Sequence, residues 1–389
     1  MSKVEHRFSD RTLLIRPSGI RQLFDLAQKM KSVINLGIGE PDFETPAHIK
    51  EAAKKALDEG YTHYTPNAGF ADLREALSEK VKRDNDLDYS SDEVIVNDGG
   101  CTGSILLSIL ALVNPGEEVI VSDPYFVVYE PAIRMVGATP VFVSIDEEND
   151  FRMLTDDVEK AVTSKTKLII VNSPCNPTGG IQLKEDLEGI ADVAKRHNLY
   201  VISDEVYEKI VYDGMKHYSI ASFEGMRNRT VTVNAFSKTY AMTGWRIGYA
   251  VGEKEIIDQM VKLQQFTMVH APAISQRAAI AALKGPQDFV KYMVEVFDER
   301  RRFITRRLNE IDGFRCPTPK GAFYVYPNIK GVGKTSEEFA NILLQEGGIA
   351  ALPGTAFGKN GEGYMRFSYA QSLDKLKEAC DRIQRITIK

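Results

Sequence analysis

Two cations stand apart in the segment SKTYAMTGWRIGY (residues 237–249). Lys238 lies eight residues before Arg246, among small, aromatic and aliphatic neighbours. A lysine beside apolar groups loses its charge at low cost, and its neutral amine is a nucleophile that can form an imine. An arginine presents a planar fork that binds a phosphate through two hydrogen bonds. Since a lysine on a solvated loop is the commoner case, the pair alone does not define a site.

Other polar residues follow short apolar runs elsewhere in the chain. Asp204 follows the run LYVIS, where a buried carboxylate needs a cation or hydrogen-bond donors, and Tyr207 comes three residues later. Asn176 precedes a proline in NSPCNPTGG, a setting that fixes the loop and its amide. Each also has a plain structural interpretation: a helix N-cap for Asp204, a core aromatic for Tyr207 and a turn residue for Asn176.

The segment DGGCTGS (98–104) adds a glycine-rich turn after another apolar run. If a helix begins near Gly103, the free amides of Gly100, Cys101 and Thr102, together with the helix dipole, favour a phosphate. An ordinary strand-to-helix turn is the alternative.

Taken together, these segments offer an amine, phosphate-binding groups, a carboxylate and a phenol. A cofactor with an aldehyde, a phosphate, a phenolic oxygen and a ring nitrogen would engage all of them, and that cofactor is pyridoxal phosphate (PLP).

Seven short apolar runs are predicted to be the strands that position these residues. They are EVIVN (93–97), EVIVS (118–122), TPVFV (139–143), KLIIVN (167–172), LYVIS (199–203), TVTVN (230–234) and RIGYAV (246–251). The runs do not alternate with polar residues, which is typical of strands covered by helices on both faces. Helical patterns such as KEDLEGIADVAKRH (184–197) fill the gaps. The alternation predicts a mostly parallel α/β sheet, which binds ligands beyond the carboxyl ends of its strands.

The 389 residues exceed the usual size of a single core, so we expect two domains. Residues 50–285 are predicted to form a large α/β domain. Residues 286–389, which begin with the amphipathic helix 289–311, are predicted to form a smaller α+β domain. Residues 1–49 would supply an N-terminal arm and part of the small domain.

Composition indicates a soluble cytoplasmic protein with small-molecule partners. The formal charge of −5 offers no broad basic surface for nucleic acid or an anionic membrane. The apolar stretch 105–113 is too short to span a bilayer, and the charged N-terminal segment resembles no secretion signal. The four cysteines lie far apart in the sequence, which suits reduced thiols in a cytosol better than disulfides or a zinc site. The six histidines form no HExxH or HxH motif, so no metal site is predicted.

The chain resembles the class I/II family of PLP-dependent aminotransferases, of fold type I. Within that family it is most similar to the prokaryotic aspartate and aromatic amino acid aminotransferases. The resemblance covers nearly the whole chain, in the family's order. It is carried by NLGIGEPDF (35–43), YTPNAGFADLREAL (64–77), NSPCNPTGG (172–180), SDEVYE (203–208), SKTYAMTGWRIGY (237–249), GAFYVYP (321–327) and MRFSYA (365–370).

The resemblance implies a role for each site residue. Lys238 would form the imine with the cofactor, Asp204 would pair with the ring nitrogen, and Tyr207 with Asn176 would bond the phenolic oxygen. Phe126, in DPYFVVY, would stack on the ring. The phosphate would be held by Ser237, Arg246 and the amides near Gly100, although Ala235 stands where some members place a further serine. Arg366 would bind the substrate α-carboxylate with the backbone of Gly39, beside Asn176. Tyr64 would reach the phosphate of a neighbouring subunit, which implies a homodimer with shared sites.

The substrate side chain is less well determined. Aspartate-specific members of the subgroup often place a lysine directly after the Gly-Gly turn, where this chain has Cys101. The segments GIGEPDF, NSPCNPTGG and HYSIAS (217–222) resemble the aromatic enzymes more closely. We therefore expect a broad-specificity aminotransferase that prefers phenylalanine, tyrosine or similar donors, with 2-oxoglutarate as acceptor. An aspartate aminotransferase remains the alternative, because Arg16 or Arg21 could supply the missing charge, and a carbon–sulfur lyase of the same fold is a further one.

Two other classes of protein compete with an aminotransferase. GVGKTS (331–336) resembles the end of a P-loop, but Asn328 stands where that loop needs glycine. A regulatory protein with a degenerate aminotransferase domain would typically carry an added DNA-binding segment, whereas this chain begins with the family's N-terminal arm and has every cofactor position intact.

Overall fold

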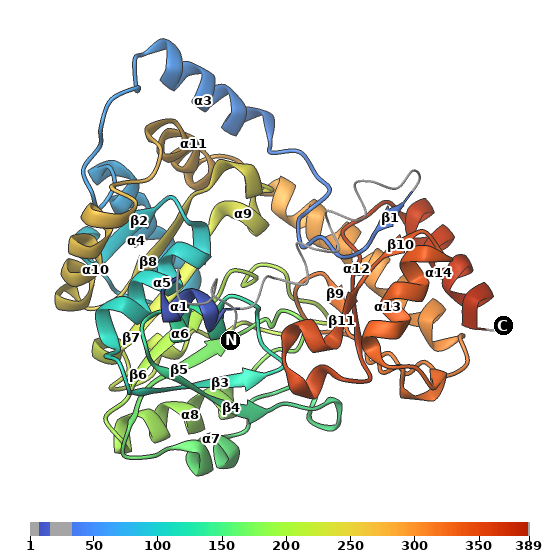
Figure 1. The fold of residues 1–389 in the computed structure, drawn as a ribbon. Helices are drawn as coiled ribbons and strands as arrows, with labels where there is room; N and C mark the ends of the chain where they lie inside the picture. The colour runs from blue at the N-terminus through green and yellow to red at the C-terminus, as the bar shows by residue number, and fades with distance from the viewer. Residues whose placement is uncertain (1–7, 16–32, 388–389) are drawn as a thin grey trace.

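The computed structural model describes residues 8–15 and 33–387, and Figure 1 shows their arrangement. The helices are α1 (Asp10–Leu13), α3 (Ala47–Asp58), α4 (Ala71–Asn85), α5 (Gly100–Leu112), α6 (Tyr129–Met135), α7 (Thr155–Ala161), α8 (Lys184–Arg196), α9 (Phe236–Thr239), α10 (Lys254–Thr267), α11 (Ala273–Lys284), α12 (Asp288–Asn309), α13 (Ser336–Gln345) and α14 (Leu373–Thr387). Both helical segments singled out in the sequence, 184–197 and 289–311, form helices with nearly the predicted bounds.

A seven-stranded sheet in the order β2-β8-β7-β6-β5-β3-β4 lies at the centre of the larger part. Its strands are β2 (Val94–Asn97), β3 (Glu118–Asp123), β4 (Thr139–Ser144), β5 (Thr166–Asn172), β6 (Tyr200–Asp204), β7 (Thr230–Ala235) and β8 (Gly248–Val251). All neighbouring strands are parallel except β8, which is antiparallel to β2 and β7. The predicted mostly parallel seven-stranded α/β sheet is therefore confirmed.

Helices cover both faces of this sheet, which explains why its central strands are mostly buried, whereas the edge strand β4 is partly exposed. On one face, α5, α6 and α10 pack on Ile95, Val121 and Ile202. On the other face, α3, α4 and α11 pack near β2 and β8, whereas α7 and α8 pack near β4 and β5. Burying each such aliphatic side chain contributes roughly 1.5–3 kcal/mol. The buried sheet is a rigid platform whose carboxyl edge carries the loops between elements.

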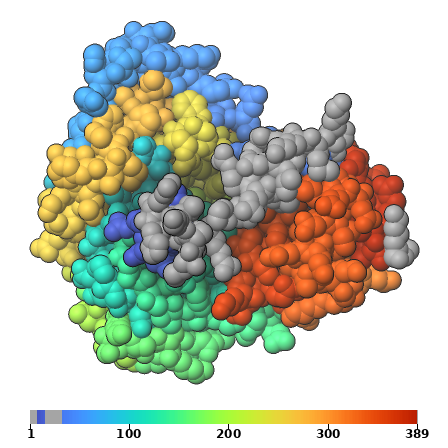
Figure 2. Space-filling view, in the orientation of Figure 1, coloured from blue at the N-terminus to red at the C-terminus, as the bar shows by residue number. Residues whose placement is uncertain are grey.

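The C-terminal helices α12, α13 and α14 gather beside this layered part around their own core, which includes Phe297, Phe323 and Phe367 (Figures 1 and 2). A small antiparallel sheet in the order β11-β12-β9 lies among them, built from β9 (Tyr324–Val325), β11 (Leu352–Pro353) and β12 (Met365–Ser368). The strand β1 (Ile34–Asn35) pairs in parallel with β10 (Ile349–Ala350). This pairing supports the proposed assignment of part of the N-terminal segment to the small domain, whose boundaries stay a prediction.

The fold bears on two possibilities that the sequence raised, a P-loop at GVGKTS and a membrane-spanning helix. The GVGKTS segment begins within the short 3₁₀ helix η7 (Lys330–Val332), and no strand directly precedes it. Thr335 is the N-cap of α13, where its hydroxyl accepts a hydrogen bond from the amide of Glu338 at 3.2 Å. A P-loop instead joins a strand to a helix, so this segment is a helix cap. None of the helices in residues 8–15 and 33–387 combines the length and apolar character that a bilayer-spanning helix needs.

Candidate active site

A cavity of about 250 Å³ lies between the carboxyl edge of the large sheet and the C-terminal part. All the predicted site residues except Gly100 and Tyr64 line it. The lining residues are Gly37, Gly39, Gly99, Cys101, Thr102, Phe126, Asn172, Asn176, Asp204, Val206, Tyr207, Ala235, Ser237, Lys238, Thr243, Arg246, Tyr324 and Arg366. The chain therefore brings residues that are distant in the sequence into one cavity. Arg366 and Gly37, which share a hydrogen bond, are 329 residues apart.

Lys238 projects into the cavity from the single turn α9, which directly follows strand β7. Its Nζ donates a hydrogen bond to the carbonyl of Gly39 at 2.5 Å and lies 5.9 Å from the centre of the Phe323 ring. Burial lowers the pKa of the Lys238 amine to about 8, against a smaller opposing effect of Glu40. A substantial fraction of the amine is therefore neutral near physiological pH, as a nucleophile requires.

Asp204 is the last residue of β6, and 2% of its surface is exposed. Its Oδ2 accepts a hydrogen bond from the hydroxyl of Tyr129 at 2.6 Å. Its Oδ1 accepts from the thiol of Cys101 at 3.2 Å and from the amide of Val206 at 3.3 Å. Burial raises the pKa of the Asp204 carboxyl, and these donors oppose that rise. Within the described part of the chain all its partners are neutral, so a cation in the cavity would complete the site.

Arg366 lies in β12 and reaches the cavity from the C-terminal part. One of its nitrogens donates to Asn176 Oδ1 at 2.9 Å and another donates to the carbonyl of Gly37. The guanidinium lies 4.4 Å from the ring centre of Tyr324 and 4.8 Å from that of Phe357. Its Nε is buried and has no hydrogen-bond partner among the described residues, and burial lowers the pKa of Arg366. No carboxylate of the described residues pairs with this cation, which leaves it free to bind an anionic ligand.

Tyr207 and Asn176 approach the cavity from the loops after β6 and β5. The hydroxyl of Tyr207 shares a hydrogen bond of 2.8 Å with that of Tyr324. The backbone amide of Asn176 donates to Asn172 Oδ1 at 2.9 Å, which fixes the loop that carries its side chain. Phenol and amide groups therefore face the same space as Asp204, as the sequence predicted.

The predicted phosphate-binding groups cluster at the start of α5. Gly100 is its first residue and has a φ of +62°, a left-handed backbone conformation that residues other than glycine rarely adopt. Arg246 has a φ of +51° and donates to the carbonyls of Gly99 at 2.8 Å and Thr243 at 3.0 Å. Ser237 also lines this end of the cavity. The cationic fork and the free helix amides are thus placed together, although Gly100 itself lies just outside the lining.

Tyr64 is not part of the cavity formed by its own chain. Its side chain is among the most exposed of the large hydrophobic residues, with 89% of its surface accessible, and its ring lies 5.6 Å from that of His270. The resemblance assigns Tyr64 to a neighbouring subunit's site, and an exposed position is what such a role requires. That assignment stays a prediction.

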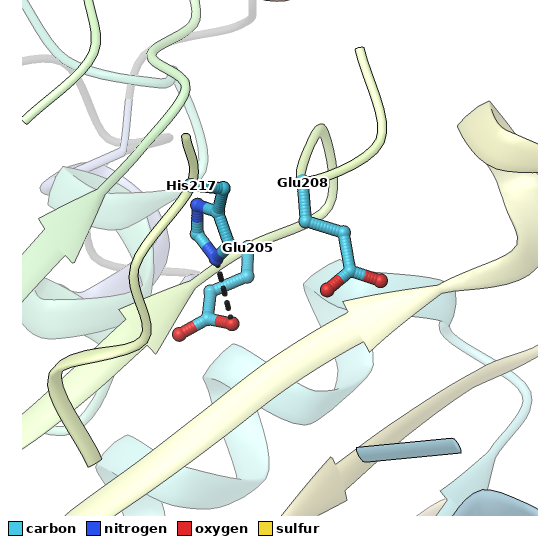
Figure 3. A group of neighbouring side chains, drawn as sticks. All are labelled: Glu205, Glu208 and His217. Carbon is cyan, nitrogen blue, oxygen red and sulfur yellow. Dashed lines mark hydrogen bonds and ion pairs between the residues drawn. The ribbon is translucent and has the colours of Figure 1, made fainter. Parts of the chain in front are cut away.

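A second group of polar side chains comes from the segment that carries Asp204 and Tyr207, together with His217, and does not line the cavity. Figure 3 shows Glu205, Glu208 and His217, whose ligand-type atoms lie within 4.8 Å of one another. His217 Nε2 lies 3.0 Å from Glu205 Oε2, and the hydroxyl of Ser219 donates to Glu205 Oε1 at 2.6 Å. Glu208 pairs with the buried Lys80. Because protein donors engage both carboxylates, the group anchors this segment.

Sequence reasoning missed two residues that shape the site. Tyr129 bonds Asp204, and Tyr324 contacts both Tyr207 and the Arg366 guanidinium. Both lie in segments that were singled out, DPYFVVY and GAFYVYP. The available signal was that Tyr129 lies three residues after Phe126, across the turn that precedes α6, where the Tyr129 amide donates to the Phe126 carbonyl at 3.0 Å.

The residues of this cavity fit PLP with an amino acid substrate. In the part of the chain that the structure describes, the buried Asp204 carboxylate has no cationic partner, which suits a protonated ring nitrogen, and the buried Arg366 guanidinium has no anionic partner, which suits a carboxylate. A family model described as Aminotransferase class I and II matches residues 31–383. The chain belongs to this family, and as a member it is an aminotransferase that uses PLP.

Relatives of known activity cover almost the whole chain. An aspartate aminotransferase of Pyrococcus abyssi is 50% identical over 380 residues, which are 97% of each chain. Aromatic-amino-acid aminotransferase 2 of Thermococcus litoralis is 47% identical over 97% of each chain. The crystal structure of an aromatic aminotransferase from Pyrococcus horikoshii matches with a TM-score of 0.89 at 48% identity, covering 94% of this chain and 98% of the other. Relatives named for aspartate and for aromatic substrates are thus similarly close, so the comparisons leave the preferred donor open.

Proposed function

We propose that this aminotransferase is a cytoplasmic homodimer that transfers the amino group of an aromatic or other uncharged L-amino acid to 2-oxoglutarate. The observation that carries this preference is the side chain of Cys101. It lies in the cavity wall, is uncharged, and donates its thiol to Asp204. No cation is therefore presented to a substrate side chain from the position after the Gly-Gly turn.

The other cations of the cavity support the same preference. Lys238, Arg246 and Arg366 are the cations that line it among the described residues. Each has a proposed partner: the cofactor aldehyde, the cofactor phosphate and the substrate α-carboxylate, respectively. Tyr324 lies in the same wall and offers aromatic surface, beside Phe126, which is assigned to the cofactor ring. A second carboxylate on the donor would find no free cation there, whereas an aromatic side chain would find apolar contacts.

When bound, PLP supplies an aldehyde that carries the amino group and a ring that accepts electron density from the substrate Cα. Asp204 would hold the proton of the ring nitrogen, Asn176 and Tyr207 would bond the phenolic oxygen, and Arg246, Ser237 and the amides of residues 100–102 would bind the phosphate. Phe126 would pack on the ring. These contacts orient the reacting carbon toward Lys238.

Lys238 would act as the base that moves the proton of the substrate. Its amine is buried, has a pKa of about 8 and is held toward Gly39. It is therefore close to the range in which a general base works at physiological pH. Arg366 would fix the α-carboxylate by two hydrogen bonds, which places Cα within reach of Nζ. Because an amino acid and a 2-oxo acid share that carboxylate, both substrates can use one site in turn.

Aspartate as the preferred donor is the second candidate. The relative from Pyrococcus abyssi is named for it, and Arg16 and Arg21, which could supply a second cation, lie outside the described residues. A carbon–sulfur lyase would instead release pyruvate and sulfide from cysteine without any oxo acid, so a cysteine control separates that reaction from transamination.

A panel of amino donors with 2-oxoglutarate as acceptor tests the proposal. We expect phenylalanine and tyrosine to exceed aspartate in kcat/KM. If aspartate instead exceeds both by about tenfold, which is about 1.4 kcal/mol of transition-state preference, the aromatic proposal is wrong. The variants Arg16→Ala and Arg21→Ala then show the source of that preference, since loss of aspartate activity alone would identify the second cation.

A further inference from the structure

We propose that Tyr129 and Cys101 are positioning residues that keep Asp204 ionised and oriented toward the ring nitrogen of PLP. The inference rests on the proposed pairing of Asp204 with that nitrogen. It gives Cys101 a role for its side chain, whereas the sequence predicted a role for its backbone amide alone. It also adds Tyr129, which has no other assigned role at this site.

The contacts come from two helices that pack on the same face of the sheet. Tyr129 is the first residue of α6, and its hydroxyl donates to Asp204 Oδ2 at 2.6 Å. Cys101 is the second residue of α5, and its thiol donates to Oδ1 at 3.2 Å. Each carboxylate oxygen therefore has its own side-chain donor. A carboxylate held at both oxygens from two elements cannot rotate freely about its Cβ–Cγ bond.

The burial of Tyr129 makes this contact persistent. Its side chain is 1% exposed, and its ring packs edge to face with that of Phe126, with centroids 5.6 Å apart. Phe126 lines the cavity, so the residue that is proposed to cover the cofactor ring also holds the tyrosine that bonds Asp204. Burial raises the pKa of the Tyr129 phenol well above its ordinary value, so it remains a donor at physiological pH.

The donors oppose the cost of burying the carboxylate. Burial alone favours the neutral acid, and a neutral Asp204 could not stabilise a protonated ring nitrogen. Hydrogen bonds to the ionised form favour it, and bonds to charged groups are stronger than bonds between neutral groups. Because both donors are neutral, the negative charge of Asp204 remains available to the ring. A lysine that reached the carboxylate from position 101 would instead neutralise it.

The affinity of the cofactor-free protein for PLP, measured from pH 5 to pH 9, tests the inference. PLP binds the ionised form of Asp204, so affinity falls as the pH drops below the pKa of this carboxyl in the free protein. Removing a donor raises that pKa, and the fall then begins at a higher pH. The titratable groups facing Asp204 are Tyr129 from α6, Cys101 from α5, Cys175 from the loop after β5, and Glu205 and Tyr207 from its own segment, with Lys238 nearby. The phosphate of PLP and Lys238 titrate in every variant, so the shift between variants reports on Asp204.

Two variants and a matched control make the comparison. We expect Tyr129→Phe to raise the Kd for PLP about tenfold at neutral pH, which is about 1.4 kcal/mol. We also expect the acid limb, which is the fall in PLP affinity at low pH, to begin at a higher pH than in the wild-type protein. Cys101→Ala should shift in the same direction by a smaller factor, since a thiol is a weak donor. Tyr89→Phe removes a comparable buried hydroxyl, which donates to the carbonyl of Arg227 at 3.0 Å instead of to Asp204, and should keep the wild-type profile.

Asp204→Asn separates a failure of the inference from a failure of the proposed site. If Asp204→Asn binds PLP with the wild-type affinity and pH profile, the pairing with the ring nitrogen is wrong. If Asp204→Asn loses affinity but Tyr129→Phe keeps the wild-type acid limb, the pairing stands and the positioning role is wrong. An equal shift in Tyr89→Phe would also overturn the inference, because the effect would then report a general loss of stability.

Discussion

At the scale of single residues, the site depends on ionisable groups whose pKa values are shifted by burial. The clearest case is Lys238, whose amine has a pKa of about 8 because it is desolvated. Burial raises the pKa of Asp204 and lowers the pKa of Arg366, and each shift favours the neutral form. Perturbed groups of this kind, gathered in one cavity, are typical of catalytic sites.

The shift of Lys238 predicts how the stability of the cofactor-free protein depends on pH. An unfolded lysine titrates near 10.4, so between about pH 8 and pH 10.4 the unfolded state binds more protons and stability rises with pH. Relative to Lys238→Met, the wild-type protein should gain on the order of 2 kcal/mol in free energy of unfolding from pH 7 to pH 10. Urea denaturation at both pH values measures this. A difference between wild type and Lys238→Met that stays constant from pH 7 to pH 10 would refute the shift.

The residues that carry unusual chemistry could be predicted from the sequence, whereas the side chains that hydrogen-bond to them and hold them in position could not. Lys238 and Arg246 were conspicuous because they are isolated cations in an apolar segment, and Asp204 because it follows a buried strand. The contact between Cys101 and Asp204 depends on how α5 packs over β6, which no local pattern records. For the same reason the anchoring of Glu205 by His217 was missed.

At the scale of elements, the strands and long helices were predictable because their apolar residues recur with a regular period. The predicted run 246–251 starts two residues before β8, because Arg246 adopts a left-handed conformation and Gly248 begins the strand. The antiparallel direction of β8 was also not predictable, since an apolar run does not record its direction. The reason for glycine at 248 is close packing: a Cβ there would lie 2.4 Å from the carbonyl carbon of Gly100.

This contact between β8 and the start of α5 predicts the effect of one methyl group. Gly248→Ala would push the helix away from the strand, so we expect it to lower the free energy of unfolding by about 1–3 kcal/mol, as overpacking does. It should also weaken PLP binding, because the amides of residues 100–102 would move. Gly244→Ala is the control, since a Cβ there meets nothing within 4 Å, and it should stay within about 0.5 kcal/mol of wild type. Equal stability and PLP affinity of the two variants would contradict this packing argument.

At the scale of the whole molecule, the cavity of one chain lacks Tyr64. The exposed ring of this residue and the resemblance to dimeric enzymes predict a homodimer in which Tyr64 serves the partner's site. Mixed dimers test this. In a dimer of Tyr64→Ala and Lys238→Ala subunits, one site has an intact lysine and an intact partner tyrosine. We expect mixing and reassembly to restore wild-type PLP affinity to that site, whereas Tyr64→Ala alone binds PLP more weakly. No gain on mixing, although mixed dimers form, would show that the sites are not shared.

The central claim is that this cavity holds PLP through the amine of Lys238, and reduction with borohydride tests it most directly. The purified protein should absorb in the near-ultraviolet or visible range, and reduction should attach the cofactor covalently. Peptide mapping of the reduced protein should find the added mass on Lys238, and Lys238→Ala should bind PLP without becoming labelled. Labelling of a different lysine in the wild-type protein, or retention of full turnover by Lys238→Ala, would contradict the account.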